Sequence, residues 1–233
     1  MNDNETQALL RTILENVARR VEEDREFLTE LDSQIGDADF GSNLHRGCQA
    51  ALEAVADIND PTPNEFIRAV GETLIDEMAG SSGIIFGMSL VNASEVIKDE
   101  ITPETIVEFV EAYRDTVADR GSVNVGAKTM YDVVVPVADT LHGTQEMSES
   151  DPDPLQMSAN AVEAARRGAQ FTSTLRAKRG RASYTEWRSV GHPDPGAVGS
   201  YIILQEIHRT LESYYDEERS HDYPNNRLKS LNK

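Results

Sequence analysis

Three aspartates, Asp32, Asp37 and Asp39, lie within eight residues of one another. Hard divalent cations such as Mg²⁺ prefer oxygen ligands and usually combine a few carboxylates with the phosphates of a substrate. Gly36 and Gly41 flank the last two aspartates and permit backbone conformations that other residues resist. The segment is therefore a candidate for half of a metal site, the other half being nucleotide phosphates. A solvated acidic surface is the alternative.

Several common sites do not fit this sequence. An EF-hand loop counted from Asp37 needs Gly at its sixth position and Glu at its twelfth. Ser42 and Cys48 stand there instead. The sequence also lacks a Walker A motif, a protein-kinase catalytic loop and the glycine pattern of a Rossmann fold. If the chain binds a nucleotide, it does so through a less common, all-helical site.

A second candidate is the segment Gly80-Ser81-Ser82-Gly83, which directly precedes an apolar run. Small residues let backbone N–H groups approach an anion closely, and the start of the following helix adds its positive dipole end. The segment therefore suits a phosphate group. A plain turn between two helices would use the same residues, so the segment alone does not decide between these interpretations.

A third candidate is a group of basic residues in an otherwise acidic chain. Its members are Arg176, Lys178, Arg179, Arg181 and Arg188. Arginine can contact phosphate through two parallel hydrogen bonds, although these bases could equally pair with surface acids. His192 follows in the same region and is assigned no chemistry. Asp194-Pro195 is typical of a helix start.

Composition excludes some classes of partner. The 233 residues contain 41 acids and 22 bases, for a net charge of −19, which argues against binding nucleic acid or an anionic membrane. We find no apolar run of about 18 residues and no signal peptide, and the single Cys48 cannot form an internal disulfide, so we expect a cytoplasmic protein. Acids are abundant and lysines few, which suggests a protein from a halophile.

Apolar periodicity predicts an all-α protein with about eight amphipathic helices and no strands. We expect one domain over residues 1–215 and a polar tail over 216–233. The expected helices cover Leu9 to Leu31, a segment from Ser42 or Asn43, one capped by Thr62-Pro63, the apolar run after Gly83, Thr102-Pro103 to Gly121, Thr129 to His142, Pro154 to Thr174, and a last one from Asp194-Pro195.

Five motifs occur in the order seen in the nucleotide-binding L subunits of dihydroxyacetone kinases. They are Gly36-Asp37-Ala38-Asp39, Ala79-Gly80-Ser81-Ser82-Gly83, Lys128-Thr129-Met130, Arg179-Gly180-Arg181-Ala182-Ser183-Tyr184 and Gly191-His192-Pro193-Asp194-Pro195-Gly196. The chain resembles this family over about residues 5–212. The resemblance implies an antiparallel eight-helix barrel or bundle with ADP and two Mg²⁺ ions at one end.

The resemblance also implies a set of ligands. Asp32, Asp37 and Asp39 would hold both metal ions. The nucleotide would contact Phe40, Gly41, Ser42, Asn43, Gly80, Ser81, Ser82, Gly126, Thr129, Met130, Arg181, Asp194, Pro195 and Gly196. The family commonly has His where this chain has Phe40, which puts a polar contact at that position in doubt. No residue of this chain is assigned a catalytic proton transfer.

The implied function is transfer of a phosphoryl group from Mg²⁺-bound nucleotide to dihydroxyacetone on a separate K subunit. A phosphohistidine protein of the phosphotransferase system, the M subunit, would rephosphorylate ADP in place, so the activity would depend on phosphoenolpyruvate rather than on free ATP. Two alternatives stay open: a subunit of a kinase that exchanges ATP and acts on dihydroxyacetone or a related triose, and a non-catalytic nucleotide-binding regulator. A homodimer is compatible with either.

Overall fold

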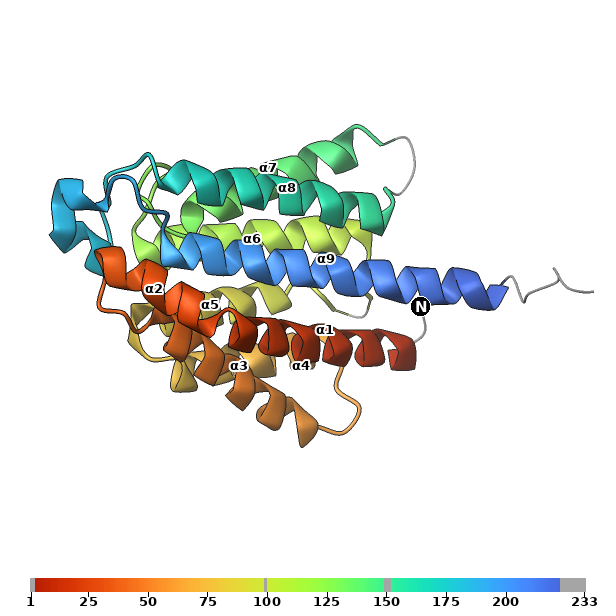
Figure 1. The fold of residues 1–233 in the computed structure, drawn as a ribbon. Helices are drawn as coiled ribbons and strands as arrows, with labels where there is room; N and C mark the ends of the chain where they lie inside the picture. Colours follow the sequence, from red (N-terminus) through yellow and green to blue (C-terminus); the bar gives the residue numbers. More distant parts are fainter. Residues whose placement is uncertain (1–2, 99, 149–151, 223–233) are drawn as a thin grey trace, which may run out of the picture.

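The computed structural model describes residues 3–98, 100–148 and 152–222, and all regular structure in these ranges is helical (Figure 1). The elements are α1 (Asp3–Glu23), α2 (Arg25–Ile35), α3 (Phe40–Ala56), α4 (Pro63–Glu77), α5 (Gly80–Ser94), α6 (Pro103–Gly121), α7 (Tyr131–Glu146), α8 (Pro154–Thr172), the 3₁₀ helix η1 (Arg181–Ser189) and α9 (Pro195–Asp222). The prediction of an all-α fold is therefore confirmed. Within the same ranges, no helix is long and apolar enough to cross a membrane.

The helices form a closed ring. Each α-helix from α3 to α8 packs against the next α-helix in sequence, and α1 contacts both α3 and α9, which closes the barrel (Figure 1). The central core contains Val21, Leu28, Leu44, Met78 and Val117, all nearly inaccessible to solvent. Because these side chains come from four different helices and from the C-cap of α4, burial of the core holds the ring together.

The first helix differs from the sequence-based expectation. We expect one helix from Leu9 to Leu31, but the structure divides it at Asp24 into α1 and α2. Counted as one interrupted helix, α1 and α2 bring the barrel to the expected eight. The short helix η1 was not expected. Helix α9 continues to Asp222, so residues 216–222 of the expected tail have helical backbone, and residues 223–233 lie outside the described ranges.

The two ends of the barrel are built differently. Residues 36–39, 78–79, 122–130 and 173–194 form one end, which we call the aspartate end (left in Figure 1). Helices α4, α6 and α8 begin at the opposite end, and the side chains of Thr62, Thr102 and Asp153 cap them. Helices α3, α5 and α7 begin at the aspartate end without a hydrogen bond from the N-cap side chain. The first amides of α3 and α7 donate instead to Asp32 Oδ2 and Thr129 Oγ1. The first amides of α5 are therefore better placed to meet a ligand.

Two glycines in helices should respond oppositely to alanine. A Cβ on Gly168 of α8 would collide with the backbone of α7, 2.9 Å from Val133 Cα, whereas a Cβ on Gly143 of α7 would meet nothing within 4 Å. Gly168→Ala should therefore destabilise the protein by about 1–3 kcal/mol through overpacking. Gly143→Ala should stabilise it by about 0.5–1 kcal/mol, because alanine loses less backbone entropy in a helix. Urea denaturation followed by circular dichroism measures both; shifts of equal sign would contradict this packing.

Candidate functional site

The three aspartates meet at the aspartate end. Each offers a carboxylate oxygen, and these oxygens lie within 4.8 Å of one another. Asp32 sits in the last turn of α2 and is buried, whereas Asp37 and Asp39 belong to the following loop and are exposed. The cluster thus combines one fixed ligand with two that face solvent.

The local fold of the loop explains this convergence. After α2 ends, Ala38 adopts a left-handed backbone with φ 61°, which turns the chain back toward the helix. The amides of Asp39 and Phe40 then donate to Asp32 Oδ2 at 2.9 and 3.2 Å. A Cβ on Gly36 would collide with the Asp32 carboxylate, so glycine is needed there. The loop and Asp32 therefore fix each other's position.

The electrostatics of the cluster favour a bound cation. Burial raises the pKa of Asp32, the negative charges of Asp37 and Asp39 raise it further, and the hydrogen bonds from the Phe40 and Asp39 amides oppose the rise. Three mutually repelling carboxylates so close together are stabilised by a positive ion. The three candidate metal ligands are all carboxylate oxygens, the type of ligand that Mg²⁺ prefers over softer ones. The residues present therefore fit the expected metal.

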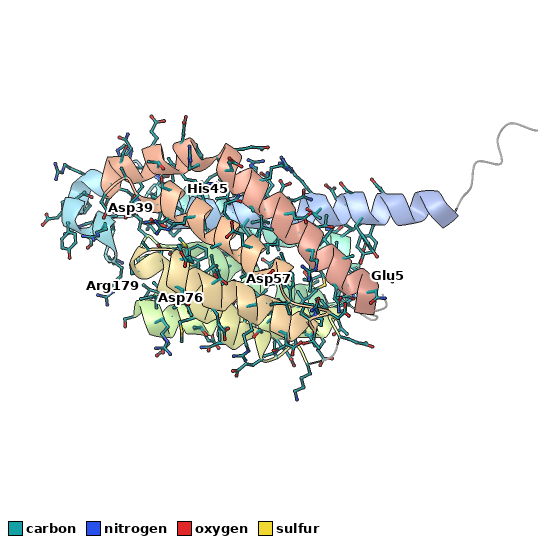
Figure 2. The ribbon with its side chains drawn as sticks, turned by 90° about the horizontal axis from the view of Figure 1, so that it is seen from below. Glu5, Asp39, His45, Asp57, Asp76 and Arg179 are labelled. Carbon is teal, nitrogen blue, oxygen red and sulfur yellow. The ribbon has the colours of Figure 1, made fainter. Side chains whose placement is uncertain are left out.

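The basic residues divide among several partners. Arg181, at the start of η1, places Nε 3.1 Å from Asp37 Oδ2, so the structure brings it to the aspartate cluster. Arg179 Nε donates to the Ser122 carbonyl at 3.0 Å, and Arg176 lies over the exposed ring of Trp187. Figure 2 shows Asp39 and Arg179 at the same end of the barrel. Arg181 is thus the member of this group with a direct contact to the expected metal ligands.

The segment from Gly80 to Gly83 forms the first turn of α5 rather than a loop before it. Gly80 has φ 82°, which few other residues adopt. A Cβ on Gly83 would collide with the Met78 carbonyl, so the chain can turn this tightly only with glycine there. Ser81 is exposed, and the N-cap Ala79 has no side-chain acceptor for the first amides. The first turn of α5 therefore remains a candidate site for binding an anion.

Two further segments lie side by side at this end. A Cβ on Gly196 would lie 3.1 Å from Asp194 Oδ2 and 3.8 Å from Met130 Cβ, so the first turn of α9 lies close to the N-cap of α7. Gly126, with φ 83°, and Thr129 belong to the loop before α7. Pro195, which begins α9, is buried. The structure therefore brings together the residues that the resemblance names in these two segments.

Residues 40–43 are placed differently from one another. The Phe40 ring packs in the core, with its centroid 6.4 Å from that of Phe86, and its amide already donates to Asp32. A Cβ on Gly41 would collide with the Arg25 carbonyl of α2, so Gly41 serves close helix packing. Asn43 is buried and accepts from Arg46 Nη2 at 3.3 Å, whereas Ser42 is exposed. The expected nucleotide contacts of residues 40–43 remain predictions.

Sequence reasoning missed a buried polar network beneath these loops. Lys128 has no exposed surface and donates from Nζ to the carbonyls of Thr172, at 2.6 Å, and His192. Asp132, also buried, accepts from the amides of Gly126 and Thr129. The available signal was a lysine between small residues, followed four positions later by an acid. Nothing in that pattern alone predicts burial.

Arg181 and Arg166 allow a matched comparison of two arginines. Arg166 lies on α8, is partly exposed, and pairs with Glu163 at 2.7 Å, far from the aspartate cluster in sequence. We expect Arg181→Ala to weaken Mg²⁺-dependent ADP binding about tenfold, because it removes a positive charge beside the expected phosphates. Arg166→Ala removes the same charge and should change the affinity less than about twofold. Calorimetric titration tests this; equal small effects would reduce Arg181 to surface charge balance.

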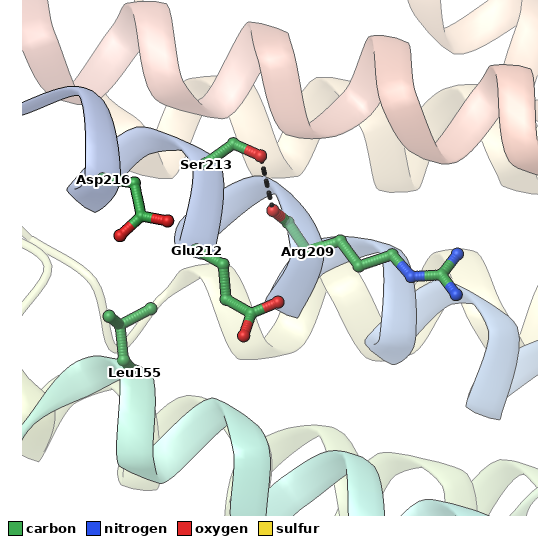
Figure 3. A pocket seen from close by; sticks show the side chains of 5 residues that line it. All are labelled: Leu155, Arg209, Glu212, Ser213 and Asp216. Carbon is green, nitrogen blue, oxygen red and sulfur yellow. Dashed lines mark hydrogen bonds between the residues drawn. The ribbon is translucent and has the colours of Figure 1, made fainter.

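A surface groove at the other end of the barrel has no contact with the aspartate cluster. A groove of about 580 Å³ lies between α8 and α9, lined by Leu155, Arg209, Glu212, Ser213 and Asp216 (Figure 3). The Ser213 hydroxyl donates to the Arg209 carbonyl of its own helix at 3.1 Å. The Glu212 and Asp216 carboxylates face the open groove. It lies away from the aspartate cluster, so we do not connect it with the expected nucleotide.

Comparison with known proteins agrees with this geometry. Residues 34–209 match the family profile described as the DAK2 domain. The chain therefore belongs to the DAK2 domain family. Within it, the chain is 37% identical over 182 residues to the ADP-binding subunit DhaL of the PEP-dependent dihydroxyacetone kinase of Escherichia coli K12, covering 77% of this chain and 85% of that protein.

Two further matches extend the comparison. The ADP-binding subunit DhaL of PEP-dependent dihydroxyacetone kinase 1 from Listeria innocua is 33% identical over 198 residues, 84% of this chain and 93% of that protein. The crystal structure of the dihydroxyacetone kinase from C. freundii with AMP-PNP and Mg²⁺ superimposes with a TM-score of 0.69 at 22% identity. That match covers 87% of this chain and 34% of the other, and it establishes a shared fold.

Proposed function

We propose that this protein is the nucleotide-binding subunit of a dihydroxyacetone kinase. It binds ADP or ATP with two Mg²⁺ ions at the aspartate end and passes a phosphoryl group to dihydroxyacetone held by a separate K subunit. A phosphohistidine protein, the M subunit, returns a phosphoryl group to the bound ADP, so phosphoenolpyruvate is the ultimate donor. The names of the E. coli and Listeria relatives support the donor and the nucleotide.

The observation that carries this proposal is the position of the carboxylate cluster at the same end of the barrel as the first turn of α5. The cluster gathers three carboxylate oxygens within 4.8 Å, and the N-cap side chain of α5 makes no hydrogen bond to the first amides of the helix. A ligand with a positive ion against the carboxylates and anionic oxygens against the amides satisfies both features. A Mg²⁺–nucleotide complex has this distribution of charge.

The chain's own residues perform positioning rather than proton transfer. Asp32, Asp37 and Asp39 would hold the metal ions, and the chemistry that bound metal would supply is neutralisation of charge on the phosphates. The α5 amides and the Arg181 guanidinium orient the phosphate oxygens. The acceptor hydroxyl is activated by the partner subunit. Because little covalent chemistry is asked of the protein, accurate placement supplies most of the rate enhancement.

A second candidate is a subunit of a kinase that exchanges free ATP. The shared fold with a dihydroxyacetone kinase crystallised with an ATP analogue, a chain about three times longer than the matched part, favours this reading. The two candidates use the same site and differ in whether the nucleotide leaves after each turnover.

The test is nucleotide binding by the purified protein. Protein stripped of nucleotide is titrated calorimetrically with ADP, with Mg²⁺ or with EDTA. We expect binding with Mg²⁺ and its loss in EDTA. Absence of binding in both conditions would refute the proposal. Exchange of bound, labelled ADP against free ATP then separates the candidates: retention favours the phosphoenolpyruvate-dependent subunit, and rapid exchange favours the ATP-dependent one.

A further inference from the structure

Lys128 is buried in a way that its position in a loop does not explain. Its exposed fraction is zero, and its backbone is left-handed with φ 63°. Its ammonium group donates to the carbonyl of Thr172, the last residue of α8, at 2.6 Å and to the carbonyl of His192. One side chain from the loop before α7 therefore contacts both the end of α8 and the segment that leads into α9.

The remaining groups of the network complete this connection. Asp132 accepts from the amides of Gly126 and Thr129, so it fixes the loop that carries Lys128. Thr172 Oγ1 accepts from the Asp194 amide at 2.9 Å, and Asp194 Oδ2 accepts from the Ala197 amide at 2.8 Å. The 126–130 loop and the 192–196 segment, which ends in the first turn of α9, are thus joined through polar groups that are buried or partly buried.

Packing alone would not call for a lysine at this position. A buried ammonium ion is costly unless it is hydrogen-bonded and paired, whereas a methionine of similar length would carry no such cost. Desolvation lowers the pKa of Lys128, and the negative charges of Asp194 and Asp132 oppose the decrease. A charged donor adds specificity of conformation. The buried ammonium group is stable only in an arrangement in which carbonyl oxygens face it.

We propose that Lys128 is a positioning residue of the nucleotide site, which holds the 126–130 loop and the 192–196 segment in the arrangement that receives the nucleotide. The inference rests on the proposed function, since Gly126, Thr129 and Met130 in the loop and Asp194, Pro195 and Gly196 in the segment are the expected contacts. Lys128 itself acts through these residues and does not touch the nucleotide.

The experiment compares three variants for two quantities. Lys128→Met removes the ammonium group and keeps the length, Thr172→Val removes the acceptor for the Asp194 amide and keeps the volume, and Lys98→Met is the control at an exposed lysine. Calorimetry gives the affinity for ADP with Mg²⁺. Hydrogen–deuterium exchange, measured on peptides, gives the local mobility of residues 124–132, 190–197 and helices α3 and α4.

We expect Lys128→Met to weaken ADP binding about tenfold or more and to accelerate exchange only in 124–132 and 190–197. Thr172→Val should weaken binding about threefold and accelerate exchange in 190–197 alone. Lys98→Met should match the wild type. Faster exchange in 124–132 and 190–197 with unchanged exchange in α3 and α4 would indicate a positioning role. Faster exchange in all of them would indicate a general loss of stability.

Several results would overturn the inference. They are unchanged ADP affinity in Lys128→Met, faster exchange throughout the protein, and faster local exchange without loss of affinity. If Lys128→Met does not fold, Lys128→Gln, which removes the charge and shortens the reach to the two carbonyls, decides by the same criteria. If the wild type binds no ADP, the proposed function fails, and the exchange data still report whether Lys128 holds the two segments together.

Discussion

Asp37→Asn is expected to reduce Mg²⁺-dependent ADP binding by about a hundredfold or more, while the helical fold stays intact. The change removes one anionic ligand from a site where metal ions, once bound, would join the protein to the phosphates. It preserves the shape of the side chain, and Asp37 is exposed, so no core contact is lost. Asp32→Asn is less informative, because Asp32 also accepts the amides of Asp39 and Phe40 and thereby shapes the loop.

The control for Asp37→Asn is Asp57→Asn. Asp57 is an exposed aspartate at the other end of α3, so this variant changes the net charge equally and leaves the cluster alone (Figure 2). Calorimetry with Mg²⁺ and ADP measures the affinities. Denaturation without Mg²⁺ should give free energies of unfolding within about 0.5 kcal/mol of the wild type for both variants, as for other exposed sites. An unchanged affinity in Asp37→Asn would refute the assignment of the loop as a metal site.

The second large effect is expected when the K subunit is added, and it concerns the phosphorylation of dihydroxyacetone. The isolated protein should not phosphorylate dihydroxyacetone with any nucleotide, because the proposed function places the acceptor on a separate K subunit. The aspartate end also places Asp37, Asp39 and Ser81 at the surface, and a facing partner is needed to exclude water during transfer. Addition of the matching K subunit should restore product formation.

Three reactions measure this. They contain the protein alone, the protein with the K subunit and ATP, and the protein with the K subunit, bound ADP and the phosphohistidine donor. Turnover by the protein alone would contradict the two-subunit proposal. Turnover with ATP but not with the donor protein would favour the kinase that exchanges free ATP.

Most of the fold could be predicted from local sequence. Thr62-Pro63 and Thr102-Pro103 each begin a helix where expected. Both threonines form capping boxes, which satisfy the first amides and define the N-terminus of the helix. The break at Asp24 could not be predicted, because the apolar spacing continues through it and only packing in the barrel decides the change of direction. Helix η1 has weak local signals, and the positive φ of Gly180 and Glu186 shapes it.

The geometry of the candidate site could be predicted where its residues are neighbours in the sequence. Asp32, Asp37 and Asp39 are neighbours in sequence, so their convergence needs only one turn of the chain. The contact of Arg181 with Asp37 joins segments more than 140 residues apart, and the periodicity of helices carries no information about it. The burial of Lys128 depends on three segments meeting at one point. The proposed salt adaptation stays a prediction.

The ring closure between α1 and α9 has a consequence for covalent attachment. Both the start of α1 and the end of α9 lie at the end of the barrel away from the aspartates (Figure 1). Helix α9 has 28 residues and is therefore about 42 Å long at 1.5 Å per residue. A tethered acceptor domain that must reach the site of the same molecule needs a linker of about 12 extended residues to run back along the barrel. With a shorter linker, the tethered domain reaches that site only if its own length spans the remaining distance, and otherwise it can serve only the site of a neighbouring copy.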